Sequence, residues 1–159
     1  MIHVRHLDFA GWCGDMPQDE CFAPLPVIAR RVAEVKNELL EKQSIVAEHV
    51  VMTSDEKNET WWREVTQDFG WVRLDHLGWA KSPDAENPDA NPIKGAPEGL
   101  ERWHEWYPLL LDATVQSSGV GFIGTDRSTM SIIARRRAES WNNASTRTVM
   151  WGRPGADDH

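Results

Sequence analysis

Several features that mark large classes of protein are absent from this sequence. None of its apolar runs is long enough to span a membrane. Lysine and arginine number 17 against 25 aspartates and glutamates, and the net charge of −8 argues against a general nucleic-acid binder. No Gly-X-Gly-X-X-Gly motif occurs, which disfavours a nicotinamide cofactor. The chain opens with MIHVRHLDF, which is typical of a strand rather than of a signal peptide.

Cysteine is also scarce. Cys13 and Cys21 are the only two, and their short spacing allows either a disulfide in an oxidising compartment or two free thiols. Glycosylation sequons begin at Asn58 and Asn143, although Asn58 alternatively caps the helix that follows it. Together the cysteines and the sequons favour the secretory pathway.

What is present fits one globular domain over residues 1–159. The hydrophobic fraction of 40% and the charged fraction of 26% are ordinary for a soluble protein, and the length suffices for a core. Most of the nine tryptophans are expected in that core. A loop over residues 76–98, rich in Pro, Asp and Asn, is long for a compact domain, and its segment from His76 to Pro97 is predicted to be mobile.

Strands and helices alternate along the rest of the chain. Hydrophobic patterns predict strands at 2–7, 49–53, 71–74, 120–123 and 148–151, and helices at 25–42, 54–69, 99–116 and 129–141. This alternation indicates an α/β fold: a Rossmann-like, doubly wound parallel sheet of about five strands with helices on both faces. In the common strand order 3-2-1-4-5, strands one and four are neighbours, and ligands bind beyond their carboxyl ends.

The stretch GFIGTDRSTMS, residues 121–131, follows this plan as a strand end and a hydroxyl-rich helix start. Taken alone, Ser128 or Thr129 more often caps its own helix than holds phosphate. The predicted topology, however, brings Arg5 toward this helix start. An arginine facing a helix amino terminus favours a bound phosphate over a cap alone.

Three segments together resemble the GDP-fucose-dependent fucosyltransferases, the protein O-fucosyltransferases and α1,6-fucosyltransferases. HVRHLDF is similar to their His-X-Arg-Arg-X-Asp motif, and GFIGTDRSTMS to a Phe-Ile-Gly-Thr strand end followed by Ser-Thr-Phe-Ser. LLLDATVQSSGVGF resembles the family's aspartate-bearing helix before that strand. The chain thus looks like the carboxyl-terminal, GDP-binding half of a GT-B glycosyltransferase.

The resemblance implies a role for each matching residue. Arg5 would bind the β-phosphate and stabilise departing GDP, and His3 would sit by the ribose or guanine. Asp112 would accept hydrogen bonds from the guanine edge. The phosphates would be held by Ser128, Thr129 and the amide of Met130. The donor would be a GDP-sugar and the acceptor a protein or glycan.

Two departures from the family pattern bear on activity. His6 replaces the second arginine of the first motif, and Met130 replaces a phenylalanine. The amino-terminal half, which supplies much of the acceptor site in the family, is expected to be absent, so this chain alone would be incomplete for catalysis. The alternative function is a nucleotide-binding module or a folded remnant without activity.

Other candidate groups have simpler interpretations. The sequence has no Asp-X-Asp motif, and that absence fits a metal-independent transferase with no metal site and no cofactor. Ser54-Asp55-Glu56 is interpreted as a capping box, and Asp157-Asp158-His159 as a solvated terminus. Among Arg127, Arg135, Arg136 and Arg137, the last three are expected on a solvated helix face.

Overall fold

The computed structural model describes residues 1–74 and 107–157, and within these it contains a five-stranded, all-parallel sheet. The strand order is β3-β2-β1-β4-β5, which confirms the predicted fold. The strands are β1 (Ile2–Val4), β2 (Val51–Ser54), β3 (Val72–Arg73), β4 (Gly121–Thr125) and β5 (Ser145–Val149).

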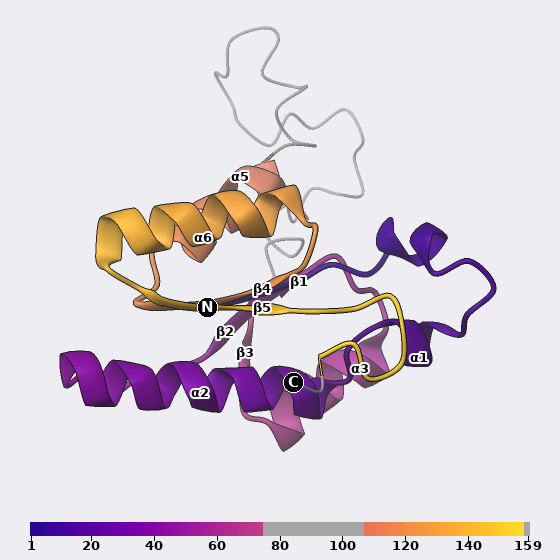
Figure 1. Ribbon diagram of the computed structural model, residues 1–159. Coiled ribbons are helices and arrows are strands. Elements are labelled where there is room, and N and C mark those ends of the chain that lie inside the picture. The colour runs from indigo at the N-terminus through magenta and orange to yellow at the C-terminus, as the bar shows by residue number, and fades with distance from the viewer. Residues whose placement is uncertain (75–106, 158–159) are drawn as a thin grey trace, which may run out of the picture.

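Helices cover both faces of the sheet (Figure 1). On one face lie α2 (Leu25–Gln43) and α3 (Glu59–Arg63), the latter continued by the π-helical turn η2 (Glu64–Asp68). On the other face lie α5 (Tyr107–Ser117) and α6 (Thr129–Asn142). The short helices η1 (Phe9–Trp12) and α1 (Gln18–Cys21) connect β1 to α2.

The spacing of apolar residues in α2 explains how this helix packs. Ile28, Val32, Val35 and Leu39 follow one another at intervals of 4, 3 and 4, which places them on one helix face. All four are buried in the core cluster beneath the sheet. The helix ends at Ser44, whose φ of 56° is left-handed and whose amide bonds to the carbonyls of the last turn.

Edge strand β5 shows where the sequence-based boundaries were wrong. The strand predicted at 148–151 begins three residues earlier and ends at Val149, and it pairs with β4 from Gly121↔Ser145 to Thr125↔Val149. Ser145, Thr146 and Arg147 are polar, and a search for apolar runs misses them. An edge strand can carry such residues because it has a neighbouring strand on one side only and lies at the rim of the sheet. The predicted loop at 76–98 lies outside the described residues.

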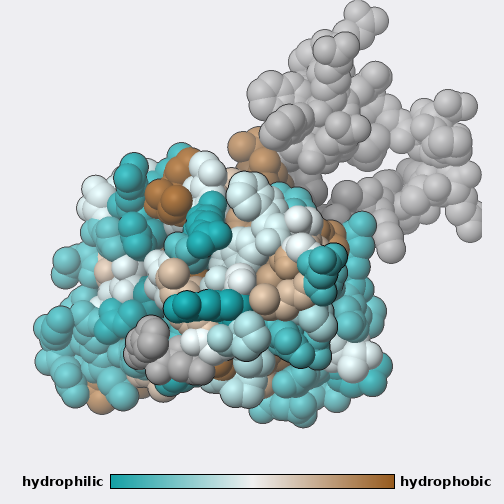
Figure 2. Space-filling view, turned by 45° about the vertical axis from the view of Figure 1, so that its right-hand side comes forward, coloured by the Kyte–Doolittle hydropathy of each residue, from teal (hydrophilic) through white to brown (hydrophobic). Residues whose placement is uncertain are grey.

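Tryptophan burial is mixed. Trp62, Trp71 and Trp151 are buried, as expected, whereas Trp12 and Trp141 are exposed. The surface is otherwise largely hydrophilic on the face shown in Figure 2, with small separate apolar patches. In the part of the chain that the structure describes, no helix has the length and apolar character needed to cross a membrane.

The two cysteines form a disulfide. Cys13 and Cys21 are bonded, with their Cα atoms 5.9 Å apart. Cys21 is buried against Phe22 and Trp151, in a small cluster beside the carboxyl edge of the sheet. The bond therefore ties the loop after β1 to the segment that leads into α2.

Reduction of this disulfide is expected to lower the free energy of unfolding by about 2.5 kcal/mol. The cross-link closes a loop with a sequence separation of 8, and its loss restores that loop's entropy to the unfolded chain. Denaturant titrations with and without reductant measure the difference. The Cys13→Ala/Cys21→Ala variant is the control, because its stability should not respond to reductant. Equal stability of the wild-type chain in both conditions would contradict the prediction.

Candidate functional site

The carboxyl ends of β1 and β4 meet at one edge of the sheet. Register pairs Ile2 with Ile123 and His3 with Gly124, so strands one and four are adjacent, as predicted. The Arg5 amide donates to the Thr125 hydroxyl at 3.0 Å, and that hydroxyl donates to the His3 carbonyl at 3.1 Å. The segments HVRHLD and GFIGTDRST therefore leave the sheet side by side.

A buried hydrogen bond joins β1 to α6 at this edge. His3 Nδ1 lies 2.7 Å from Ser131 Oγ, which also accepts the Thr125 amide at 3.0 Å. Burial, with a smaller contribution from the charge of Arg5, lowers the pKa of His3 to about 4. His3 is therefore neutral at pH 7. A Cβ added to Gly124 would lie 2.7 Å from Ser131 Cβ, so glycine is needed for α6 to approach this closely.

The start of α6 is capped by its own sequence. Buried Ser128 is the N-cap, and its hydroxyl accepts the Ser131 amide at 3.3 Å. The capping interpretation of Ser128 is thus confirmed. The amides of Thr129 and Met130 belong to the first turn, where a helix offers no intrahelical acceptor. These two amides and the positive end of the helix dipole form the part of the site that remains suited to an anion.

Arg5 is held by two carboxylates rather than aimed at α6. Its Nε lies 2.7 Å from Asp8 Oδ1 and 3.2 Å from Asp55 Oδ2, and its Nη2 donates to Asp8 Oδ2 at 3.0 Å. The hydrogen bond to Asp8 raises the pKa of Arg5 against the opposing effect of burial, with the charge of Asp55 adding to it, and the same bond lowers the pKa of Asp8. The Asp8 side chain is 58% exposed, and so open a pair contributes only about 0–1 kcal/mol.

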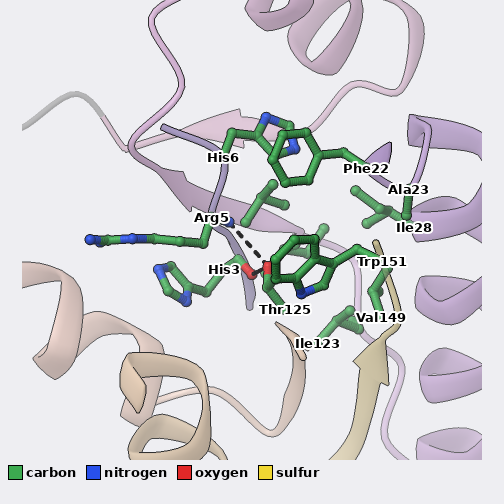
Figure 3. Close-up of a pocket in the computed structure, with 12 residues that line it drawn as sticks. His3, Arg5, His6, Phe22, Ala23, Ile28, Ile123, Thr125, Val149 and Trp151 are labelled. Atoms are coloured by element: carbon green, nitrogen blue, oxygen red, sulfur yellow. Dashed lines mark hydrogen bonds between the residues drawn. The ribbon is translucent and has the colours of Figure 1, made fainter. Parts of the chain in front are cut away.

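The cavity that Arg5 lines is small (Figure 3). Its free volume is about 20 Å³, which is room for roughly one water molecule. The lining residues come from β1, β4 and β5 with the residues that follow β1 and β5, from the Phe22 segment and from Ile28 of α2, and not from the first turn of α6. This cavity therefore does not connect Arg5 to the amides of Thr129 and Met130.

A second cavity lies beside the loop that precedes α6. It measures about 160 Å³, and Arg127, Ser131 and Arg135 are among its lining residues. The Arg135 side chain is 40% exposed, and its Nη1 donates to Thr148 Oγ1 at 3.4 Å. Arg136 and Arg137 are exposed, as predicted. The Arg127 guanidinium lies over the Trp151 ring, 5.6 Å from its centroid, and contacts Asp126 at 3.4 Å.

The carboxylates that follow β2 were misinterpreted from the sequence. Asp55 accepts the His6 amide at 2.8 Å and contacts Arg5, while Glu56 binds the His6 imidazole. The helix cap is instead Asn58, which accepts the amides of Thr60 and Trp61. The position of these residues in the sequence could have indicated their contacts. Residues that follow a strand next to β1 lie at the same edge of the sheet as the residues that follow β1.

Asp112 lies on α5, one turn before Gln116. Because residues four apart share a helix face, Asp112 is on the side from which Gln116 donates to Thr53 of β2. Asp112 is half-buried, and burial raises its pKa to about 7. A carboxyl group with a strongly raised pKa is a candidate for a binding role.

Comparison of the chain with protein-family models, with curated proteins and with solved structures gave no match. Within residues 1–74 and 107–157, no group of three or more His, Cys, Asp or Glu side chains is arranged to hold a metal ion.

Proposed function

We propose that this edge of the sheet binds the diphosphate of a GDP-sugar, and that the chain is the donor-binding domain of a metal-independent glycosyltransferase of the fucosyltransferase type. The observation that carries the proposal is the His3–Ser131 hydrogen bond of 2.7 Å. It joins the two sequence motifs that resemble this family, at the edge where parallel α/β sheets bind ligands.

The proposed phosphate contacts come from α6 and β1. The Thr129 and Met130 amides and the Thr129 hydroxyl donate to phosphate oxygens, while Ser128 shapes the turn as its cap. Arg5 exchanges Asp8 for the β-phosphate, which its planar guanidinium can bind through two hydrogen bonds. His3 has an indirect role: its buried, uncharged ring bonds Ser131 and so orients the start of α6.

The proposed reaction is a direct displacement at the sugar carbon. A hydroxyl of a protein or glycan attacks C1, and the bond from C1 to the β-phosphate oxygen breaks. GDP departs with the electron pair, and its negative charge is stabilised by Arg5 and the first turn of α6. Fucose is the sugar that the sequence resemblance implies.

Calorimetric titration with GDP, GDP-fucose, UDP and ADP tests the proposal. GDP and GDP-fucose should bind, and both should bind more tightly than UDP and ADP. Equal affinity for the four nucleotides, or no binding of any, would overturn the proposed function.

GDP affinity is expected to rise with pH through neutrality. Ionised Asp112 accepts the N–H groups of guanine, and its pKa of about 7 in the free protein means that protons compete below that pH. Affinity should fall by up to about tenfold per pH unit below 7. Calorimetry between pH 6 and 8, roughly one unit either side of that pKa, measures this. Asp112→Asn is the control, because titration of the phosphate itself is common to both proteins. Identical pH dependence in both would contradict the assignment of Asp112.

A nucleotide-binding module without catalysis is the second candidate. It is favoured by the two carboxylates, Asp8 and Asp55, that already neutralise Arg5. Release of GDP from bound GDP-fucose distinguishes the two, because a pure binding module would retain the intact donor.

A further inference from the structure

A groove lies on the other side of the β1 end from α6. The side chains of the consecutive residues Arg5 and His6 point in different directions, as Figure 3 shows. Arg5 contacts Asp8 and Asp55, whereas His6 stacks on Phe22 with ring centroids 4.5 Å apart. The groove measures about 340 Å³, and its lining includes His6, Phe22, Glu56, Asn58, Trp61 and Glu64.

Glu56 fixes the orientation and tautomer of His6. Its Oε2 lies 2.8 Å from His6 Nδ1, while its Oε1 accepts the amides of Lys57 at 2.7 Å and Asn58 at 2.8 Å. Burial raises the pKa of Glu56, but the hydrogen bonds from Asn58, His6 and Lys57 outweigh burial, and the net shift is downward. Glu56 is therefore an anion at neutral pH. An acceptor carboxylate at Nδ1 requires the proton on that nitrogen, so Nε2 of the neutral ring carries the free lone pair.

Packing holds this ring in place. Phe22 stacks on one face of His6, and Trp61 approaches it edge-on with centroids 5.4 Å apart. The His6 side chain is 12% exposed, so it contacts the groove without being freely solvated. A histidine oriented by a carboxylate, with its second nitrogen unprotonated, is the arrangement of a general base.

We propose that His6 is the general base that deprotonates the acceptor hydroxyl in the groove, with Glu56 as its positioning residue. This inference rests on the proposed function. The acceptor oxygen bonds to C1 of the sugar as its proton passes to His6 Nε2. The bond from C1 to the phosphate oxygen breaks, and GDP leaves with the electron pair.

The placement of His6 and Arg5 suits an in-line displacement. By the proposed function the leaving phosphate would lie on the α6 side of the β1 end, whereas the groove is lined by residues of α1 and α3. The sugar carbon would lie between them, with the attacking oxygen opposite the departing one.

The charged groups around His6 are mainly acidic. Asp55 and Glu56 follow β2, Glu64 belongs to η2, and Asp19 belongs to α1. Arg5 and Asp8 lie on the same segment as His6, and Arg5 is neutralised by Asp8 and Asp55. The carboxylates outnumber the cations, and Glu56 is the one that bonds the ring.

Single-turnover hydrolysis of GDP-fucose, with water as the acceptor, tests the inference. His6→Asn should slow release of GDP by about 100-fold or more, with GDP affinity unchanged. Glu56→Gln should slow release of GDP with GDP affinity unchanged, because an amide can no longer fix the proton on Nδ1 of His6. Glu56→Asp, which keeps the carboxylate, should recover part of the rate, whereas a merely structural role of Glu56 would not distinguish the charged from the neutral replacement. His49→Asn, at an exposed histidine, is the matched control.

The outcomes separate this inference from the proposed function. If GDP binds but wild-type protein does not hydrolyse GDP-fucose, or if His6→Asn hydrolyses it at the wild-type rate, His6 is not the base and donor binding still stands. If GDP does not bind, the proposed function fails and the inference fails with it. Slow hydrolysis in His6→Asn, restored by added imidazole, supports the assignment directly.

Discussion

Replacing Asp157 with alanine is expected to lower the free energy of unfolding by about 3 kcal/mol, because it breaks a buried ion pair. The Asp157 side chain is only 2% exposed. Its Oδ2 accepts Arg31 Nε at 2.8 Å, and its Oδ1 accepts the Met150 amide at 3.1 Å. Alanine leaves the Met150 amide without this acceptor and leaves Arg31 to its contacts with Glu34.

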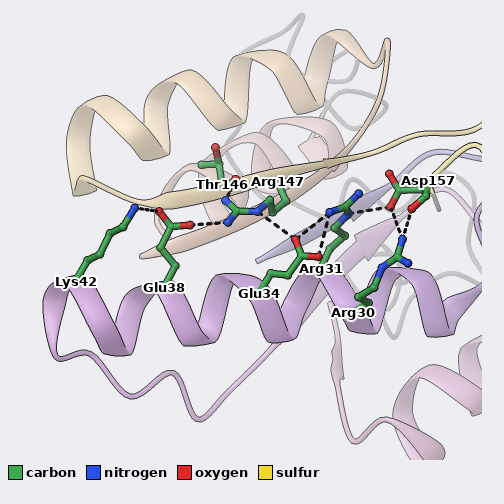
Figure 4. A network of polar contacts seen from close by, with 8 residues as sticks. All are labelled: Arg30, Arg31, Glu34, Glu38, Lys42, Thr146, Arg147 and Asp157. Carbon is green, nitrogen blue, oxygen red and sulfur yellow. Dashed lines mark hydrogen bonds and ion pairs between the residues drawn. The ribbon is translucent and has the colours of Figure 1, made fainter. Parts of the chain in front are cut away.

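Asp157 stands at one end of a longer polar network (Figure 4). Arg31 contacts Glu34 at 2.9 Å, Glu34 contacts Arg147 at 3.2 Å, and Arg147 contacts Glu38 at 2.7 Å. Arg30 also donates to the backbone carbonyl of Asp157. The network joins the carboxyl-terminal turn and edge strand β5 to α2. The sequence-based interpretation of Asp157 as part of a solvated terminus was therefore wrong.

Denaturant titration measures this effect. Asp157→Asn keeps the shape and loses the charge, so its destabilisation should be smaller than that of Asp157→Ala. Glu48→Ala, at an exposed carboxylate, is the control and should change stability by less than about 0.5 kcal/mol. A loss in Asp157→Ala no larger than in this control would show that the terminal turn contributes nothing to stability.

The fold was predictable because it depends on periodicity and chain order. Ile28, Val32, Val35 and Leu39 mark the buried face of α2, and the alternation of elements fixes the parallel sheet. The position of β5 was not predictable by the same means. Arg147 lies in that strand opposite Ile123, and Glu34 and Glu38 bind its side chain from α2, a tertiary contact between residues more than 100 positions apart.

The candidate site was predictable in its location but not in its pairings. Strand order alone brought Arg5 toward the start of α6, whereas His3, which bonds Ser131 of α6, was singled out only by the family resemblance. Which acceptor Arg5 takes depends on a competition among nearby carboxylates, and only the three-dimensional arrangement shows that Asp8 and Asp55 reach it. Ser131 was overlooked because it looks like one more helix hydroxyl, although its spacing of three from Ser128 is typical of a residue whose amide is capped.

Replacing Arg5 with alanine is expected to weaken GDP binding by about 2 kcal/mol, or about 30-fold, because a charge-assisted contact to the diphosphate is lost. The fold should survive, since the Arg5 contact to Thr125 is made by the backbone amide. Asp55 also keeps its bond to the His6 amide. Arg5→Lys should recover only part of the affinity, because lysine keeps the charge without the planar fork. Arg63→Ala, at an exposed arginine on α3, is the control and should bind GDP normally.

Asp8→Asn separates the proposed exchange of partners from a purely structural role of Arg5. If GDP displaces Asp8 from Arg5, removing the charge of Asp8 removes a competitor, and affinity should rise by up to about fivefold, the equivalent of an exposed ion pair. If Arg5 and Asp8 only fix the loop after β1, Asp8→Asn should weaken binding or leave it unchanged. Calorimetry on Asp8→Asn, Arg5→Ala and the double variant decides between them. In the double variant the benefit of removing Asp8 should disappear, because the arginine for which it competed is gone.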